Sequence, residues 1–384
     1  MTRPTDLVLL IDDDPGVRTG VASALEREGR TVLACSDLES AQVLIETLPI
    51  RAAIADVRLS GPFAFEGLDF IDYVQEKQPG TRVVLMSGYA SNALRREAAA
   101  RGAITLLQKP CSVDELEAAI ETDVSRNQDA LAARTIHVPD IHDLLSGQRV
   151  ENVFQPIMRA TSTGYSVFGY ESLARVAADV PLNSPELLFR YAERKKRLID
   201  IELACISNAF AGSMKIPDNA RIFLNVHPHV LSASNFAQAV VDLAVARGVA
   251  LDRFVFEVTE QGELTIDRAT LDGIARLRDR GVTFAFDDLG IAYSHLSHMP
   301  AVRPQFLKIS QHFGTGFESD PFRQKIVRNI ASLAADFGVE TILEGVESDA
   351  TANAARELGI TLLQGYVFGR PAEVGKLNLA DTEN

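Results

Sequence analysis

Acidic side chains follow short apolar runs at several points in the second half of the chain. Glu257 comes directly after Phe254-Val255-Phe256, and Asp287 and Asp288 come directly after Phe284-Ala285-Phe286. Carboxylates crowded into one pocket repel each other by about 4 kcal/mol per pair at 4 Å and an effective dielectric of 20, so such a pocket needs cations. Oxygen ligands without His or Cys favour Mg²⁺ or Mn²⁺, and an adjacent Asp-Asp pair offers the bridging ligand of a two-metal phosphoryl-transfer site.

The complete set contains amide and ammonium groups as well as acids. In chain order it comprises Glu171, Asn225, Glu257, Asp287, Asp288, Lys308, Glu344 and Gln364. For any one of these acids, a solvated position at the start of a loop is the simpler interpretation. The repeated placement beside apolar runs favours a shared site instead, in which Lys308 has a lowered pKa and orients or deprotonates a water molecule.

A second group of such side chains lies in the first third of the chain, again after apolar runs. Its members are Asp12, Asp13, Asp56, Ser87 and Lys109. Ligands of open parallel sheets gather at the carboxyl ends of the strands, where these residues would converge. Clustered carboxylates there favour one Mg²⁺, and a lysine and a hydroxyl could bind the remaining oxygens of a phosphoryl group on Asp56.

The elements that must position these groups differ between the two parts. Residues 1–122 alternate five apolar runs with five helical patterns, which predicts a doubly wound, five-stranded parallel sheet of the flavodoxin-like kind. Residues 123–145 are polar and irregular and are predicted to be a linker.

Residues 146–384 contain eight strand candidates with helical stretches between most of them, which predicts a modified TIM (β/α)8 barrel. The candidates are Asn152–Ile157, Val167–Leu173, Arg221–Val226, Phe254–Val258, Thr283–Asp287, Phe306–Ile309, Thr341–Gly345 and Thr361–Tyr366. Catalytic groups of such barrels lie at the carboxyl ends of the strands, where the acidic set falls.

Composition narrows the class of protein. The 384 residues carry a net charge of −14, which repels a phosphate backbone and argues against binding nucleic acid polymers. No apolar run approaches the roughly 20 residues of a membrane-spanning helix. The first residues lack a secretory signal, and the three cysteines form no CxxC pair, so we expect a cytoplasmic protein without membrane partners.

Residues 6–122 resemble the receiver domain of two-component response regulators. The resemblance rests on Asp12-Asp13, Asp56, Ser87 and Lys109-Pro110 at successive strand ends. It implies that a cognate sensor histidine kinase phosphorylates Asp56, that Asp12 and Asp13 bind Mg²⁺ with it, that Ser87 is the switch hydroxyl and that Lys109 contacts the phosphoryl group. Leu106 stands where many family members carry the switch aromatic residue.

The second part resembles the EAL domain of cyclic-di-GMP phosphodiesterases, through eight motifs in the family's order. They are Gln155-Pro156-Ile157, Glu171-Ser172-Leu173-Ala174-Arg175, Asn225-Val226, Glu257-Val258-Thr259-Glu260, Phe286-Asp287-Asp288-Leu289-Gly290, Leu307-Lys308-Ile309, Glu344-Gly345-Val346-Glu347 and Gln364-Gly365-Tyr366. The resemblance implies hydrolysis of one phosphodiester of cyclic di-GMP to linear pGpG.

The same resemblance implies roles for individual residues. Two Mg²⁺ or Mn²⁺ ions would be held by Glu171, Asn225, Glu257, Asp287 and Asp288. Lys308 and Glu344 would assist the water, with Gln364 positioning it or the metal shell. Arg175 would contact a substrate phosphate, Gln155 a guanine edge, and Glu260 would brace the loop after Asp288.

Two departures from the family leave a second function open. Leu289 to His295 reads Leu-Gly-Ile-Ala-Tyr-Ser-His where the family usually has Phe-Gly-Thr-Gly-Tyr-Ser-Ser, and Ser310 replaces the usual Asp. The main hypothesis is a homodimeric or larger phosphodiesterase controlled by phosphorylation. The alternatives are a non-catalytic cyclic-di-GMP receptor and a protein-interaction module that binds neither nucleotide nor metal.

Overall fold

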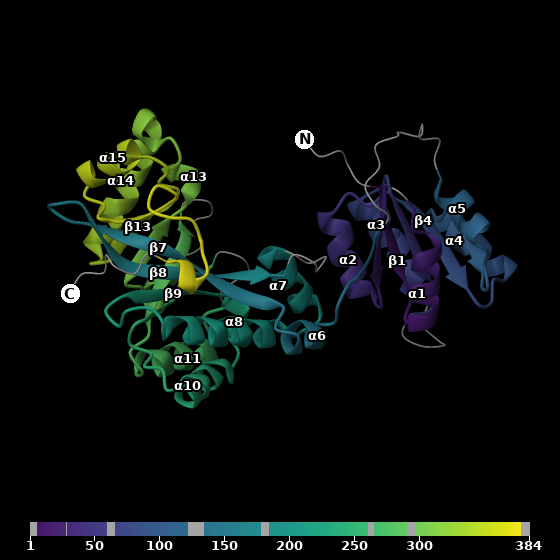
Figure 1. Cartoon of the computed structure of the whole chain (residues 1–384), viewed down its shortest axis with the longest axis horizontal. Coiled ribbons are helices and arrows are strands. Elements are labelled where there is room, and N and C mark those ends of the chain that lie inside the picture. Colours follow the sequence, from purple (N-terminus) through teal and green to yellow (C-terminus); the bar gives the residue numbers. More distant parts are fainter. Residues whose placement is uncertain are drawn as a thin grey trace. The chain divides into compact units, whose positions relative to one another are not determined.

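The computed structural model describes residues 6–27, 29–59, 66–121, 134–177, 184–259, 265–289 and 297–377, apart from the side chains of Arg134, Asp288 and Leu289. The chain forms two compact units (Figure 1). The first contains residues 1–149 and 176–197, and the second contains residues 150–175 and 198–384.

The first unit is built on a parallel sheet with the strand order β5-β4-β3-β1-β2-β6. Its strands are β1 (Asp6–Ile11), β2 (Arg30–Cys35), β3 (Ala52–Asp56), β4 (Arg82–Ser87), β5 (Thr105–Gln108) and β6 (Arg134–His137). The parallel α/β fold is confirmed, but the sheet has six strands rather than the five expected. The sixth lies in the predicted linker, because the free edge of β2 offers unpaired backbone groups that a short polar segment can join.

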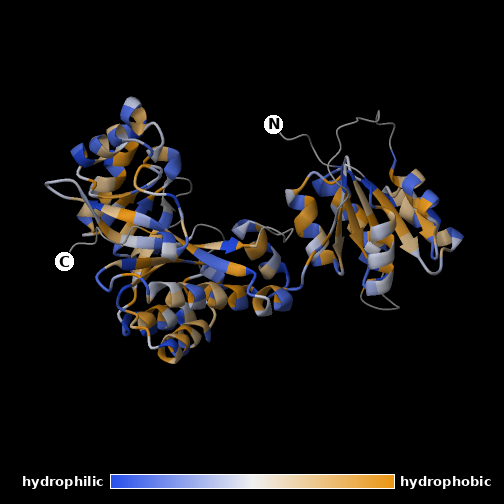
Figure 2. Cartoon of the chain, in the orientation of Figure 1, coloured by the Kyte–Doolittle hydropathy of each residue, from blue (hydrophilic) through white to orange (hydrophobic). Residues whose placement is uncertain are grey.

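Seven helices accompany this sheet among the described residues. They are α1 (Pro15–Ala24), α2 (Leu38–Thr47), α3 (Glu66–Lys77), α4 (Asn92–Arg101), α5 (Val113–Ile120), α6 (Ile141–Ser146) and α7 (Pro185–Arg194). Side-chain oxygens at their N-termini satisfy otherwise unpaired amides; Asp14, for example, accepts hydrogen bonds from the amides of Gly16 and Val17. Buried apolar side chains of β1, β2, β3 and β4 form a core with residues of α1 and α5 (Figure 2).

The second unit is a closed barrel with the order β10-β11-β12-β13-β14-β7-β8-β9, which confirms the predicted eight strands. They are β7 (Val150–Ala160), β8 (Tyr165–Val176), β9 (Arg221–Val226), β10 (Phe254–Val258), β11 (Thr283–Leu289), β12 (Phe306–Ile309), β13 (Glu340–Leu343) and β14 (Leu362–Gln364). β7 runs antiparallel to β14, whereas the pairs from β8 through to β14 that are described run parallel. The barrel is therefore a modified (β/α)8 barrel.

Helices follow the barrel strands and lie outside them (Figure 1). They are α8 (Leu198–Ser213), α9 (Pro228–Leu231), α10 (Phe236–Arg247), α11 (Arg268–Arg278), α12 (Met299–Val302), α13 (Gln311–Gly314), α14 (Pro321–Asp336) and α15 (Asp349–Glu357), with short 3₁₀ turns η2 (Phe317–Ser319) and η3 (Val374–Lys376). Across the described part of the chain, every helix is too short or too polar to span a bilayer.

The barrel interior contains an apolar layer to which every strand contributes one side chain. These residues are Ile157, Phe168, Phe223, Val255, Ala285, Phe306, Ile342 and Leu362. Because strand residues two apart face the same side, the positions two residues further toward the carboxyl ends also face the barrel axis. Those positions include Asn225, Glu257, Asp287, Lys308 and Glu344. The polar site thus lies directly above a packed hydrophobic floor.

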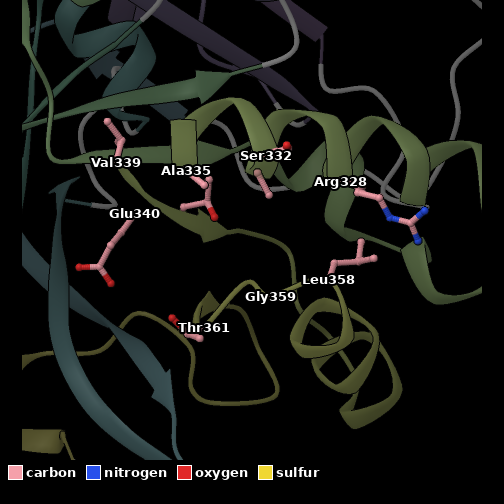
Figure 3. Close-up of a pocket in the computed structure, with 10 residues that line it drawn as sticks. Arg328, Ser332, Ala335, Val339, Glu340, Leu358, Gly359 and Thr361 are labelled. Carbon is pink, nitrogen blue, oxygen red and sulfur yellow. The ribbon is translucent and has the colours of Figure 1, made fainter. Parts of the chain in front are cut away.

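A separate cavity of about 380 Å³ lies at the amino ends of β13 and β14 (Figure 3). Its lining includes Arg328, Glu340 and Thr361. Glu344 and Gln364 stand at the opposite, carboxyl ends of these strands, so this cavity is distinct from the polar site.

Candidate active site

Lys308 lies at the centre of the polar layer and contacts four carboxylates. Its side chain is fully buried on β12. Its Nζ lies 2.8 Å from Glu344 Oε1, 3.1 Å from Glu171 Oε2, 3.1 Å from Glu257 Oε1 and 3.5 Å from Asp287 Oδ1. These distances show that side chains from β8, β10, β11 and β12 and from the end of β13 lie together in one place.

The charge balance around Lys308 corrects one expectation. Burial alone would lower the pKa of the ammonium, but the carboxylates of Asp287, Glu171, Glu257 and Glu344 raise the pKa well above its ordinary value. The predicted lowered pKa is therefore wrong, because sequence spacing does not reveal how many acids contact one ammonium. A shift in this direction keeps Lys308 protonated beside its acidic neighbours.

Glu257 is the least satisfied carboxylate of the site. It is fully buried, and neither of its oxygens has a hydrogen-bond partner among the residues that the structure describes. Burial and the neighbouring carboxylates raise the pKa of Glu257 well above its usual range despite the attraction of Lys308. One ligand atom each from Glu171, Glu257 and Asp287 lies within 4.8 Å of the others, so the three could share a metal ion.

Glu171 is held by amide donors from two other strands. Asn225 Nδ2 donates to Oε1 at 2.9 Å, and Gln364 Nε2 donates to Oε2 at 2.6 Å. Burial alone would raise the pKa of Glu171, but Lys308 and these donors outweigh it and lower that pKa. Glu171 lies inside β8 rather than at its end, because this strand continues to Val176.

Gln155 lies in the same layer, and Arg175 lies further along β8. Gln155 Oε1 accepts a hydrogen bond from Gln364 Nε2 at 3.3 Å, and its own Nε2 donates to the carbonyl of Gly369 at 3.2 Å. Arg175 is half-buried and donates to the carbonyl of Ala174 at 2.7 Å. Their predicted contacts with a nucleotide therefore stay predictions.

Glu344 follows β13 and is positioned by close backbone packing. Burial raises its pKa to about 8, and Asp287 and Glu171 add to the shift while Lys308 opposes it. A Cβ atom on Gly314 would lie 1.7 Å from the carbonyl oxygen of Glu344, and Gly345 has a φ of +68°. Sequence reasoning missed Gly314, since nothing in the local sequence reveals which backbone it will contact.

Glu202 on α8 is a second residue that the sequence did not single out. It is 2% exposed, and its Oε1 accepts a hydrogen bond from the amide of His227 at 2.8 Å, directly after the strand that carries Asn225. Burial raises the pKa of Glu202 to about 8. Its position in the middle of an apolar helix is the signal that could have identified it.

Three expected features fall wholly or partly outside the described residues. Glu260 and most of the altered loop from Leu289 to His295 are outside them, as is the side chain of Asp288. Ser310, at the other departure from the family pattern, is buried and accepts a hydrogen bond from the amide of His312 at 3.4 Å, which caps α13.

The first unit brings a separate group of residues together at the carboxyl ends of β1, β3 and β5. Lys109 Nζ lies 2.6 Å from Asp12 Oδ2 and 2.5 Å from Asp56 Oδ2. Ligand atoms of Asp12, Asp13 and Asp56 lie within 4.8 Å of one another. Burial raises the pKa of Asp12, although the contact with Lys109 opposes this shift.

Ser87 lies at the end of the adjacent strand β4 and is buried. Its hydroxyl oxygen accepts a hydrogen bond from the amide of Tyr89 and donates to the Tyr89 carbonyl, each at 3.2 Å. In this structure the hydroxyl therefore bonds to its own loop. Leu106 is buried in β5 at the position where an aromatic residue is usual.

Comparison with known proteins finds a family match for each part of the chain. Residues 139–371 match the EAL domain, and residues 8–121 match the response regulator receiver domain. The chain is 26% identical over 382 residues to the cyclic di-GMP phosphodiesterase RocR of Pseudomonas aeruginosa, covering 95% of each protein. It is 30% identical over 164 residues to the cyclic di-GMP phosphodiesterase PdeL of Escherichia coli, covering 42% of this chain and 44% of PdeL.

Solved structures share the fold. The structure of the PaMucR phosphodiesterase in complex with c-di-GMP matches with a TM-score of 0.55 and 23% identity, covering 62% of this chain and 97% of that chain. A manganese/cy-diGMP complex of Klebsiella pneumoniae BlrP1 matches with a TM-score of 0.52 and 25% identity, covering 59% of this chain and 56% of that chain. The chain belongs to the EAL domain family and carries a response regulator receiver domain ahead of its EAL domain.

Proposed function

We propose that this protein is a response regulator that hydrolyses cyclic di-GMP to linear pGpG in its barrel. The observation that carries the proposal is the buried polar layer, in which the ligand atoms of Glu171, Glu257 and Asp287 lie within 4.8 Å of one another above an apolar floor. The similarity to RocR over 95% of both chains supports the same activity.

The donor set fits divalent metal ions. Four carboxylates face one ammonium, and the two buried oxygens of Glu257 lack hydrogen-bond partners among the described residues. Glu171, Asn225, Glu257, Asp287 and Asp288 would hold two Mg²⁺ or Mn²⁺ ions. Bound ions of this kind supply Lewis-acid activation of a phosphodiester and lower the pKa of a water molecule.

The chain's own residues would perform the remaining tasks. Lys308 keeps its charge because of its acidic neighbours, so it can orient a water molecule or a phosphodiester oxygen. Glu344, with a pKa of about 8, can exchange a proton near neutral pH. Gln364 fixes the carboxylate of Glu171, while Arg175 and Gln155 would contact a phosphate and a guanine edge of the substrate.

Product analysis tests this activity. Purified protein incubated with cyclic di-GMP and Mn²⁺ should form pGpG, and Glu171→Ala should abolish its formation because a ligand is lost. A Glu171→Ala variant with near-wild-type turnover would contradict the site. Nucleotide binding without product would instead support the receptor function that the altered loop after Asp288 leaves open.

The receiver residues support control by phosphorylation at Asp56. Lys109 and the pair Asp12-Asp13 surround Asp56 with the groups that a phosphoryl group and one Mg²⁺ need. We expect a small-molecule phosphodonor to change the turnover of the wild type but not that of Asp56→Asn. An equal change in both would rule out this route. The cognate kinase, a homodimeric or larger assembly and a cytoplasmic location remain predictions.

A further inference from the structure

Helix α8 makes polar contacts with the strands that carry two of the candidate metal ligands. It packs against β7 and β9 within the second compact unit (Figure 1). β9 carries Asn225, and the chain turns from β7 into β8, which carries Glu171. The buried face of α8 is mostly apolar, so a polar group on that face needs a partner. Polar links between this helix and the strands can therefore hold the ligands in place.

The first link joins Glu202 to the end of β9. The buried carboxyl group of Glu202 accepts a hydrogen bond at Oε1 from the amide of His227, at 2.8 Å. This amide belongs to the segment that leaves β9, two residues after Asn225. The other oxygen of Glu202 is buried and has no hydrogen-bond partner among the described residues. A carboxyl group buried for one such bond adds little stability, which favours a role in positioning the backbone beside Asn225.

Asn225 passes this constraint on to Glu171. Its Nδ2 donates to Glu171 Oε1 at 2.9 Å, and Gln364 Nε2 donates to the other oxygen at 2.6 Å. Because a donor holds each oxygen, the carboxylate of Glu171 has a defined orientation before any ion binds. A shift of the end of β9 would move the amide group of Asn225 and weaken one of these two bonds.

The second link joins α8 to the strand of Glu171 itself. Nδ2 of Asn152, on β7, donates to Ser172 Oγ at 2.8 Å and to the carbonyl of Cys205, on α8, at 3.2 Å. Ser172 is buried and follows Glu171 directly, so the two side chains point to opposite faces of β8. Asn152 therefore holds β8 from outside the barrel, at the position of its metal ligand.

We propose that Glu202 and Asn152 are positioning residues of the metal site, which align Asn225 and Glu171 with each other before an ion binds. This inference rests on the proposed function, because it takes Asn225 and Glu171 to be ligands of the ion. Each positioning residue acts through the backbone of a strand rather than as a ligand. Loss of groups that orient metal ligands typically weakens metal binding by about 10–100-fold.

The Mn²⁺ affinity of the full-length protein tests the role of Glu202 without substrate. Electron paramagnetic resonance measures free Mn²⁺, and the binding that Glu171→Ala abolishes is the share of the barrel. Glu202→Leu cannot accept the bond from His227, so it should weaken this binding about tenfold or more. Glu202→Gln keeps an acceptor oxygen and should stay within about threefold of wild type. Equal losses in the two variants would overturn the role of the hydrogen bond.

Asn152→Ala tests the second link, with Asn208→Ala as its matched control. Both asparagines are half-buried and donate to a backbone carbonyl between α8 and β7, but Asn208 bonds to Val150 at the start of β7. Asn152→Ala should weaken Mn²⁺ binding about tenfold, whereas Asn208→Ala should stay within about threefold of wild type. An equal loss in both would show that loosening of α8, and not the position of Glu171, lowers the affinity.

The same titrations separate the positioning role from the proposed function. If wild type and Glu171→Ala bind Mn²⁺ equally, the barrel holds no ion, and the proposed function fails together with the positioning role. If Glu171→Ala loses binding but folded Glu202→Leu and Asn152→Ala bind like wild type, the positioning role alone is overturned. Urea unfolding shows which variants are folded. Should Glu202→Leu not fold, the comparison of Asn152→Ala with Asn208→Ala decides.

Discussion

At the scale of single residues, two buried carboxylates beside one ammonium behave in opposite ways. Glu171 and Glu257 both lie 3.1 Å from Lys308 Nζ. Burial would raise the pKa of Glu171, but Lys308 and the donors Gln364 and Asn225 lower it. Burial and the neighbouring carboxylates raise the pKa of Glu257 despite Lys308, and Glu257 has no such amide donors in the described structure. Because both acids share Lys308, the hydrogen bonds to Glu171 and the carboxylates around Glu257 account for the opposite directions of the two pKa shifts.

This difference predicts that Glu257→Gln separates stability from activity. Glu257 faces Lys308 but accepts no hydrogen bond among the described residues, so replacing this buried acid with a neutral amide should raise the free energy of unfolding of the metal-free protein by about 1–3 kcal/mol. The same change should lower turnover at least about a hundredfold, since a metal ligand is lost. Urea unfolding in EDTA and product assays measure both effects. The control is Glu340→Gln, which removes a surface ion pair with Arg159 and should change neither stability nor turnover strongly. A Glu257→Gln variant that is less stable than wild type would refute the assignment of Glu257 as a metal ligand.

Glu202 gives a pH dependence with a defined sign. Burial raises its pKa from 4.5 to about 8, so the folded state binds a proton that the unfolded state has lost between these values. The free energy of unfolding should therefore fall as pH rises from about 4.5 to about 8, by up to about 1.4 kcal/mol per pH unit from this group. Glu202→Gln should remove that slope in denaturant titrations at several pH values. Parallel curves for variant and wild type would contradict the buried neutral acid.

At the scale of elements, the alternation of strand residues builds the site. On most strands the polar residue of the site comes two residues after the residue of the apolar layer. The packed apolar layer therefore fixes the level in the barrel at which the candidate metal ligands lie. The segment that follows β12 contains Gly314, whose backbone packs closely against that of Glu344. Because Gly314 has no side chain, the carbonyl oxygen of Glu344 can approach its backbone closely.

Gly314→Ala should consequently disturb both packing and activity. The new Cβ would meet the Glu344 carbonyl at 1.7 Å, so the backbone must move. We expect a loss of about 1–3 kcal/mol in stability and of about tenfold or more in turnover. Gly375→Ala is the matched control in the same unit, because its Cβ would meet nothing within 4 Å. Similar behaviour of the two variants would show that the close approach is unimportant.

The elements that depend on local pattern were predictable, and those that depend on distant partners were not. The bounds of β9, β10 and β12 agree with the sequence prediction because each is a buried apolar run. β6 was missed because Arg134-Thr135-Ile136-His137 becomes a strand only by pairing with β2. The positions of the acids after apolar runs predicted that they would come together. The pKa of Lys308, in contrast, depends on its distances to four carboxylates, which cannot be read from the sequence.

At the scale of the whole molecule, the compact units do not coincide with the sequence families. The EAL match begins at residue 139, whereas the second compact unit begins at residue 150 and excludes residues 176–197. Part of the enzyme's sequence thus folds with the receiver. Each unit also holds its own cluster of carboxylates, one around Asp56 and one around Glu257.

Metal binding should therefore stabilise the two units separately. Mn²⁺ at about one hundred times its dissociation constant should add about 2.7 kcal/mol to the stability of the unit that binds it. Calorimetric scans should show that Glu171→Ala removes the Mn²⁺ effect on the barrel while leaving the effect on the receiver, and that Asp56→Asn does the reverse. Loss of both effects in one variant would show that the clusters are not independent.

The most direct measurement is the rate of pGpG formation from cyclic di-GMP over a Mn²⁺ titration, for wild type and Glu257→Gln side by side. We predict that wild-type product formation requires Mn²⁺ and saturates with it, and that the variant forms little product at any concentration. Wild-type turnover that persists in EDTA, or full activity in Glu257→Gln, would contradict a metal-dependent phosphodiesterase site in the barrel.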